Sequence, residues 1–381
     1  MPKSPPACKP CGLNKQANGA RFPGFGSNEN VMSDLSSTKT AEKITVVTTM
    51  KDEGAYILDW ISYYKALGVD DFIVFTNDCS DPTDEILRTL HAKGIIEHRF
   101  NKVMRRGAHK SALMWARYEP KVREADWLMV IDCDEYLQIN LGDGTLRALL
   151  EANRDADAIS LVWRIYGNAG VKNIEDRPIP QIFTRAQPKE GKAGERRFFK
   201  TIFRNNGKFD RMGVHRPFLA VPPSEVHWVV PDGTRMMDDE IGGSIGVRDN
   251  YGYEAAQLNH YALRSIDGFL NKRNRGRANH FGGAFEPSYW RRFDKNQVEE
   301  TAMAERFGIA CEFRDELMAD PDLQRFHAEA VEWHVRRARK ARRTDEGKAF
   351  LQDIRRYRRK MAREEAAAAE AAAQSGDLAA E

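Results

Sequence analysis

The stretch from residue 44 to residue 137 alternates short apolar segments with amphipathic ones, and this alternation restricts the fold more than any other feature. The predicted strands are rich in β-branched and aromatic residues and lie at 44–50, 71–77, 95–100 and 126–137. The predicted helices lie between them, at 52–68, 80–94 and 108–125, with Pro120 a break in the last. Strands that alternate with helices form a parallel sheet covered on both faces. We therefore expect an α/β fold.

The loops that follow the strands are where a ligand site is expected. Right-handed crossovers place every loop from a strand to the next helix at the carboxyl edge of the sheet, which is where ligands bind in open α/β folds. In this chain those loops are 50–54, 77–82, 101–110 and 132–140.

The last predicted strand ends in an acidic cluster. In "VIDCDEYL" the residues Asp132, Asp134 and Glu135 follow a run of apolar residues. Carboxylates repel one another and are costly to desolvate, and a hard cation such as Mg²⁺ or Mn²⁺ would offset that repulsion. The residues by themselves leave three interpretations open: a solvated strand end or turn, a buried ion-pair network, or a divalent metal site.

Two segments of the sequence together resemble a known family. "TTMKDEGAYILDWISYYKALGVDDFIVFTNDCSDPTDEIL" followed by "DWLMVIDCDEYL" resembles the glycosyltransferase family 2-like enzymes of GT-A fold. The resemblance covers residues 43–137 well and 138–280 more loosely. It implies a Rossmann-like α/β/α sandwich with a mostly parallel sheet. It also implies metal-dependent transfer of a sugar from a nucleoside-diphosphate sugar, a UDP-sugar above all, to a saccharide or lipid-linked acceptor in cell-surface polysaccharide or glycolipid synthesis.

The resemblance also implies roles for individual residues. In the family the loop after the first strand touches the nucleotide, which here points to Thr49, Lys51, Asp52 and Glu53. The family's second strand usually ends in an aspartate that binds the base or ribose, and this chain has Asn77 there with Asp78 beside it. The D-x-D motif, which holds Mn²⁺ or Mg²⁺ on the donor diphosphate, falls on Asp132 and Asp134.

Other residues are candidates on chemical grounds. Lys110, with Arg105 and Arg106, could clamp the diphosphate, or these cations could merely form a solvated basic loop. Lys272, Arg273 and Arg275 could contact phosphate or a charged acceptor, or merely face water. A histidine late in such domains often completes the metal site; His260 is the first candidate and His215 the second, against structural roles. An inverting transfer needs a carboxylate base, for which the candidates are Asp238, Asp239 and Glu240, against ordinary solvated residues.

Two other functions are also compatible with the sequence. A sugar nucleotidyltransferase has a similar fold, but "TTMKDEGA" lacks the glycine-rich loop usual in those enzymes. A catalytically inactive binding module is the other alternative. No G-x-x-x-x-G-K-[ST] motif stands at a predicted strand–helix junction, so a kinase function loses support, and no obvious Ser/His/Asp arrangement indicates a hydrolase.

Composition changes along the chain and predicts its organisation. Residues 1–42 are rich in Pro, Gly, Asn and Ser and are expected to be disordered. The glycosyltransferase domain is expected over 43–320, with a nucleotide-binding half at 43–140 and an acceptor half at 141–320. Residues 321–381 are expected to form a basic helical tail with a disordered end.

The tail is strongly cationic. Between Val335 and Arg363 there are thirteen Lys or Arg against three Asp or Glu, and Phe350, Ile354, Tyr357 and Met361 form one apolar face. Such a helix suits a peripheral contact with an anionic membrane, or it packs on the domain as a solvated helix; nucleic acid is a weaker choice.

Cysteine usage and hydropathy predict the compartment. The five cysteines are scattered, which suits a reducing environment, and the Cys8–Cys11 pair has no second pair to form a zinc site. The N-terminus lacks the apolar core of a secretory signal, and Met32 is a plausible alternative start. We expect a cytoplasmic enzyme, with a peripheral contact on the inner membrane face as the alternative that the tail leaves open.

Overall fold

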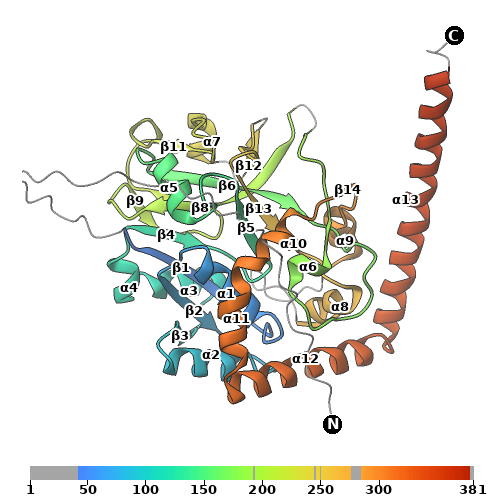
Figure 1. The fold of residues 1–381 in the computed structure, drawn as a ribbon, viewed down its shortest axis with the longest axis horizontal. Helices are drawn as coiled ribbons and strands as arrows, with labels where there is room; N and C mark the ends of the chain where they lie inside the picture. The colour runs from blue at the N-terminus through green and yellow to red at the C-terminus, as the bar shows by residue number, and fades with distance from the viewer. Residues whose placement is uncertain (1–41, 192–193, 244–245, 249, 276–284, 378–381) are drawn as a thin grey trace, which may run out of the picture.

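A computed structural model describes residues 42–191, 194–243, 246–248, 250–275 and 285–377 (Figure 1). The segment predicted to be disordered, apart from residue 42, lies outside the described residues, as do Cys8, Cys11 and the last four residues of the tail.

A central sheet of ten strands organises the chain. Eight of its strands follow one another in the order β3-β2-β1-β4-β8-β6-β13-β5, while β11 pairs with β6 and β12 with β8. The strands are β1 (Ile44–Met50), β2 (Asp71–Thr76), β3 (Glu97–Phe100), β4 (Trp127–Val130), β5 (Glu135–Ile139), β6 (Ala158–Ile165), β8 (Arg196–Arg204), β11 (Trp228–Val229), β12 (Gly246–Arg248) and β13 (Ala256–His260). The first four run parallel, and antiparallel pairs enter from β8 onward. The predicted α/β fold with a mostly parallel sheet is confirmed.

Helices cover both faces of this sheet. They are α1 (Ile57–Ala66), α2 (Thr83–Ala92), α3 (Ala108–Ala116), α4 (Pro120–Arg123), α5 (Leu146–Ala152), α6 (Ile179–Ile182), α7 (Asp238–Gly242), α8 (Ile266–Arg275), α9 (Pro287–Phe293), α10 (Ala302–Arg306), α11 (Cys311–Met318), α12 (Pro321–Ala341) and α13 (Asp345–Asp377). Two short 3₁₀ helices are η1 (Pro223–Glu225) and η2 (Phe307–Ala310), and β7 (Arg185–Ala186) with β14 (Val298–Glu299) and β9 (Phe209–Arg211) with β10 (Phe218–Leu219) form two small ribbons.

The alternation of side chains along the strands explains the two layers. Val46 of β1 packs in one core with Trp60 of α1, whereas its neighbour Val47 packs in the other core with Ala112 of α3. Successive side chains of a strand point to opposite faces, so a strand buried on both sides is apolar throughout. This is why the predicted strands show continuous apolar runs.

The predicted strand at 126–137 is wrong in one respect, because the structure divides it. β4 ends at Val130 in the interior of the sheet, between β1 and β8, and β5 begins at Glu135 at one edge of the sheet, beside β13. The backbone between them is bound elsewhere: the indole of Trp60 donates to the carbonyl of Asp132, and the amide of Tyr261 donates to the carbonyl of Asp134. The acidic cluster therefore lies where the chain crosses from one strand to the other.

Two predicted helices are also shorter than expected. α1 begins only at Ile57, because Asp52 adopts the left-handed region with φ 50° and starts a loop rather than a helix. α3 ends at Ala116, and α4 begins at Pro120, the predicted break.

The C-terminal helices are part of the folded body before they leave it. α12 packs against α2, α8 and α11, and its residues Leu323, Ala330 and Ala338 are fully buried. α13 first packs against α9, burying Phe350 and Ile354, and then projects from the body (Figure 1). It continues through the alanine-rich stretch to Asp377, which is further than predicted. None of the described helices is long and apolar enough to cross a membrane.

Candidate active site

A cavity of about 810 Å³ opens at the carboxyl ends of β1, β2 and β4. Most of the predicted site residues line it together: Thr49, Lys51, Glu53, Asn77, Asp78, Asp132, Asp134 and His260. They come from four segments of the chain, from Thr49 in the first to His260 in the last, and the sheet brings their strand ends to one edge. This arrangement agrees with the expectation that the loops after the strands meet at one site.

Asp132 and Glu135 share one buried cation. The Lys200 Nζ atom, from β8, lies 2.9 Å from Asp132 Oδ2 and 3.5 Å from Glu135 Oε2, and the lysine side chain is completely buried. Burial raises the pKa of Asp132, but Lys200 and His109 outweigh it, so that this pKa lies below its usual value. Glu135 accepts from the Asp132 amide at 2.9 Å, and its complete burial raises its pKa well above the usual value. The site thus has an ionised Asp132 beside a Glu135 that resists ionisation.

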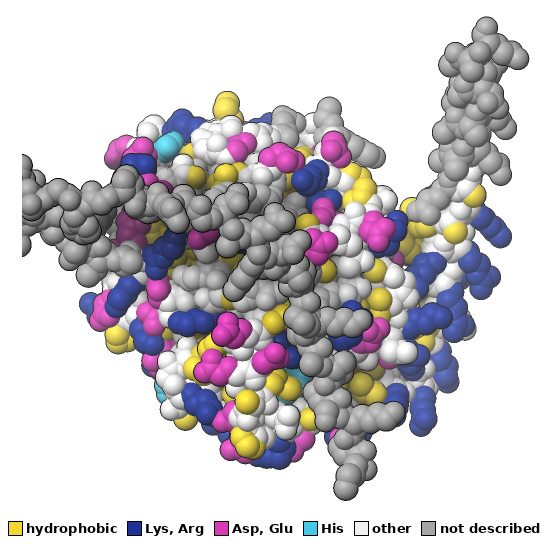
Figure 2. Space-filling model, viewed as in Figure 1, with side chains coloured by type: hydrophobic (Ala, Val, Ile, Leu, Met, Phe, Trp, Pro, Cys, Tyr) yellow, Lys and Arg dark blue, Asp and Glu magenta, His cyan; other side chains and the backbone are white. Residues whose placement is uncertain are grey.

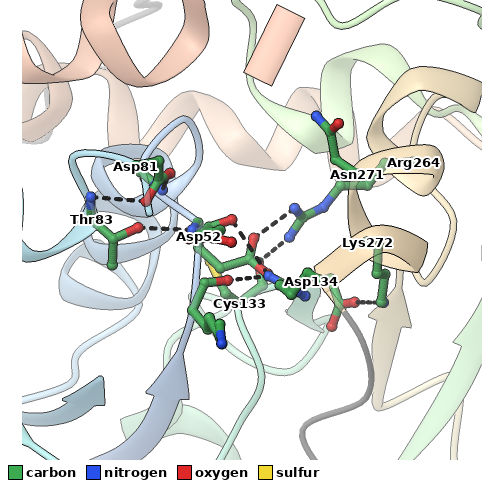
Figure 3. A network of polar contacts seen from close by, with 12 residues as sticks. Asp52, Asp81, Thr83, Cys133, Asp134, Arg264, Asn271 and Lys272 are labelled. Atoms are coloured by element: carbon green, nitrogen blue, oxygen red, sulfur yellow. Dashed lines mark hydrogen bonds and ion pairs between the residues drawn. The ribbon is translucent and has the colours of Figure 1, made fainter. Parts of the chain in front are cut away.

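Asp134 has its own cation. The Lys272 Nζ atom, from α8, lies 2.7 Å from Asp134 Oδ2 (Figure 3). His260 Nε2 lies 3.7 Å from Asp134 Oδ1. Burial raises the pKa of Asp134, but Lys272 and His260 more than compensate and hold that pKa below its usual value. Burial lowers the pKa of His260 to about 4, so its imidazole is neutral near pH 7.

Glu53 joins the first loop to α8. Its two carboxylate oxygens lie 2.7 Å from Arg264 and 2.7 Å from Arg275, respectively. The Arg264 guanidinium also stacks 3.8 Å from the centre of the Tyr56 ring and donates to the carbonyl of Cys133. Burial raises the pKa of Glu53, but the two arginines reverse this and lower it. Arg275 and Lys272 both line the cavity and place two cations beside the acidic pair.

The donor atoms of the acidic pair suit a divalent cation. Asp132 and Asp134 present hard carboxylate oxygens to the cavity, and His260 Nδ1 is buried without a hydrogen-bond partner within the described part of the chain. Among the described residues, no group of three His, Cys, Asp or Glu side chains is arranged as a complete metal site. Mg²⁺ is typically held by one or two carboxylates together with substrate phosphates, so the two aspartates fit an ion that arrives with a diphosphate.

The opposite side of the cavity is aromatic. Trp163, Phe198, Phe285, Tyr289 and Phe293 line it, with His215 among them. The Trp163 ring centre lies 4.1 Å from that of His260 and 5.5 Å from that of Phe198. The cavity therefore combines the charged side chains described above with a cluster of five aromatic ones.

Several predicted residues do not reach this cavity. Lys110 is exposed and is not among the lining residues, and Arg105 and Arg106 are exposed as well. Asp238, Asp239 and Glu240 lie on α7, outside the lining: Asp238 pairs with Arg235, Asp239 with Arg248, and the buried Glu240 accepts from the backbone amide of Arg248. These contacts tie α7 to β12, and a role for the three acids as the general base stays a prediction.

Sequence reasoning missed Lys200, Arg264 and His109. Lys200 stands in "RRFFKTIFR", where a lone charge in an apolar strand signals a buried ion pair, but nothing local says which acid it meets. Arg264 and His109 carry no signal that separates them from surface residues. His109 lines the cavity beside Asp132.

The fold, the cavity and the sequence match to a glycosyltransferase family identify the protein as a glycosyltransferase of the GT-A type, with Asp132 and Asp134 beyond the carboxyl end of β4. The chain belongs to glycosyltransferase family 92, whose model matches residues 46–238. No protein with a curated description matches the chain.

Solved structures give weaker likenesses. S. aureus TarS residues 1–349 in complex with UDP-GlcNAc is 11% identical, with 78% of this chain and 81% of that one covered and a TM-score of 0.33. The same protein in complex with UDP is 14% identical over 35% of this chain and only 38% of that one, with a TM-score of 0.27. Mycobacterium tuberculosis glucosyl-3-phosphoglycerate synthase, in complex with Mn²⁺, UDP and glucosyl-3-phosphoglycerate, is 20% identical over 33% and 46% of the two chains, with a TM-score of 0.23. The family assignment rests on the family model and not on these likenesses.

Proposed function

We propose that this protein transfers a sugar from a nucleoside-diphosphate sugar, a UDP-sugar in the first instance, to a saccharide or lipid-linked acceptor with the help of Mn²⁺ or Mg²⁺. The observation that carries the proposal is the meeting of Asp132 and Asp134 with Lys272 and Arg275 in one cavity. The two aspartates suit a divalent metal ion, and Lys272 and Arg275 suit the negatively charged diphosphate that would bind with it.

The lining residues divide the work between donor and acceptor. Asn77, Asp78 and Thr49 would bind the nucleoside, because they end β1 and β2 at the edge of the cavity. Lys272 and Arg275 would stabilise the negative charge that develops on the departing diphosphate. A bound metal would act there as a Lewis acid, held by Asp132 and Asp134 with His260 beside them. Carbohydrate rings bury their apolar faces on aromatic side chains, so Trp163 and Phe198 would receive the acceptor.

A donor-hydrolysis and binding assay tests this proposal. Purified protein is incubated with UDP-glucose, UDP-galactose and UDP-GlcNAc, with Mn²⁺ and with EDTA, and the released UDP is measured. We expect metal-stimulated release from at least one donor and binding of UDP itself. Binding of no nucleotide under any condition would contradict the proposal, and turnover of a sugar phosphate with UTP would instead identify a nucleotidyltransferase.

The predicted base is tested in the same assay. If α7 supplies the base, at least one of the substitutions Asp238→Asn, Asp239→Asn and Glu240→Gln should lower the rate of transfer. An unchanged rate in all three would remove α7 from the chemistry.

We also propose that the tail holds the enzyme against an anionic lipid surface in the cytoplasm. The exposed side chains Arg336, Arg339, Lys340 and Arg343 lie at the end of α12 and just beyond it, and Arg355, Arg356, Arg359, Lys360 and Arg363 continue the cationic surface along α13. Figure 2 shows this band of Lys and Arg along the edge of the molecule. Because Phe350 and Ile354 are buried against the body, the contact would be electrostatic rather than an insertion of the apolar face.

A further inference from the structure

Helix α12 packs against the loop of residues 51–54, which follows β1. The His334 Nε2 atom lies 3.0 Å from Asp81 Oδ2, and both side chains are buried. The same Asp81 oxygen accepts from the Gly54 amide at 2.9 Å, and its other oxygen accepts from the Thr83 amide at 3.1 Å (Figure 3). His334 is therefore joined to the backbone of the loop by two hydrogen bonds that meet at Asp81.

A second contact reaches the loop without Asp81. A Cβ added at Gly54 would lie 2.8 Å from the Cβ of Ala330, one helical turn before His334. The helix thus packs directly on the loop backbone, and the contact requires both a glycine at 54 and a small residue at 330. Two independent contacts from one helix hold the loop in place.

The position of the loop backbone in turn determines where the Glu53 side chain lies in the cavity. The Glu53 amide donates to Thr83 Oγ1 at 2.8 Å, which fixes the backbone from which the Glu53 carboxylate reaches Arg264 and Arg275. On the far side, the Asn271 side chain of α8 donates to the carbonyl of His334 at 2.8 Å. α12 therefore touches both the loop and the helix that carries Lys272 and Arg275, the two cavity cations.

From this geometry we infer that His334 is a positioning residue for nucleotide-diphosphate binding, and that α12, which lies outside the segment 46–238 matched by the family, sets the relative placement of loop 51–54 and α8. The inference rests on the proposed function for its ligand. Its structural part, the restraint of the loop by His334, is independent of that function.

The chain offers a matched control on the same helix. His327, seven residues earlier on α12, is also buried and pairs with Asp176 at 2.8 Å, but neither residue lines the cavity. His327→Ala removes a histidine–aspartate pair on the same helix and away from the loop, in which the histidine is buried and Asp176 is exposed. Comparing it with His334→Ala separates positioning from simple stabilisation of α12.

The experiment measures UDP binding by calorimetry with Mn²⁺ present, and hydrogen exchange of the loop amides without nucleotide. We expect His334→Ala to weaken UDP binding about tenfold and to speed exchange in residues 51–56, the size of effect that one lost buried hydrogen bond produces. His327→Ala should change UDP binding less than about twofold, and His334→Gln, whose amide can still donate to Asp81, should recover part of the loss. Ala330→Val keeps the His334–Asp81 pair but crowds the loop at Gly54, so it should also weaken UDP binding. It provides a second test if the His334→Ala protein does not fold.

Equal effects of His327→Ala and His334→Ala, or unchanged binding and exchange in His334→Ala and Ala330→Val, would overturn the inference. If the unaltered protein binds no nucleotide but His334→Ala still speeds exchange of the loop, the proposed function fails and the structural restraint stands.

Discussion

The Nζ atom of Lys200 lies 2.9 Å from Asp132 Oδ2 at a position that no solvent reaches. A lysine is almost never fully buried unless it is paired, so this contact accounts for both residues at once. Asp132 faces the cavity with part of its surface, and Lys200 supports it from inside the sheet. The acidic cluster is thereby stable before any ligand arrives.

Removal of that cation should be costly. Lys200→Met keeps most of the side-chain volume but leaves Asp132 without its cation, and loss of one partner of a buried pair costs about 3–5 kcal/mol. The free energy of unfolding, measured by urea titration, should fall by that amount. Lys208→Met is the control, because Lys208 is partly exposed and its partner Asp157, at 2.7 Å, keeps hydrogen bonds from Asn206 and the His227 amide, so that the loss should be about 1 kcal/mol or less. Equal losses in the two variants would contradict a special role for Lys200.

The two aspartates should be required for sugar transfer. Asp132→Asn and Asp134→Asn keep the shape but remove the charge that a divalent cation needs, and each should lower kcat/KM for the donor by about 10²-fold or more in Mn²⁺. Asp143→Asn, in an exposed turn, should leave it unchanged. Steady-state kinetics over a range of Mn²⁺ concentrations measure the effect. Activity of Asp134→Asn within threefold of the unaltered protein would contradict the metal site.

His98 should make stability depend on pH. Burial lowers its pKa to about 4 from an ordinary value of 6.5, and its Nε2 lies 2.8 Å from Thr76 Oγ1. Between pH 6.5 and 4 the unfolded chain therefore binds the proton more readily than the folded one, so this group destabilises the fold as the pH falls, by about 3 kcal/mol at the lower end. His98→Gln should flatten that part of the profile of unfolding free energy against pH. A profile with an unchanged slope would show that His98 does not titrate in this way.

Gly54 should tolerate no side chain. In Gly54→Ala the new Cβ would lie 2.8 Å from Ala330 Cβ and 2.9 Å from Asp81 Oδ2, so the helix or the loop must move, at a cost of about 1–3 kcal/mol. Gly308→Ala is the matched control, because a Cβ there meets no atom within 4 Å. Thermal unfolding of both variants measures the difference. Similar melting temperatures would mean that α12 does not press on the loop.

The cationic tail should bind anionic vesicles. The triple variant Arg355→Glu, Arg359→Glu, Arg363→Glu should lose most of the sedimentation with vesicles of 30% phosphatidylglycerol, because each cation near such a surface contributes about 1 kcal/mol. A triple variant with the same change of charge elsewhere, Arg88→Glu, Arg154→Glu, Arg211→Glu, should retain it, and raised salt should weaken binding. Binding to neutral vesicles that equals binding to anionic ones would contradict an electrostatic contact.

Local pattern was enough to predict the first half of the sheet. β1 and β2 are short apolar strands between helices with clear ends, and their carboxyl ends carry Thr49 and Asn77 to the cavity as expected. The division of the predicted strand at 126–137 was not predictable, because Trp60 and Tyr261, which bind its backbone, are far away in the sequence. Residues such as Lys200 and Arg264 were missed for the same reason.

The amino-acid sequence by itself determined the parallel arrangement of the first strands, the acidic pair and the class of enzyme, because these depend on periodicity and on a motif within a short segment. Only the tertiary structure decided which charges meet: Lys200 with Asp132, Lys272 with Asp134, and His334 with Asp81. The partners in these pairs are 68, 138 and 253 residues apart. A buried ion pair depends on distance in space and on exclusion of water, and neither is set by the residues adjacent in the chain.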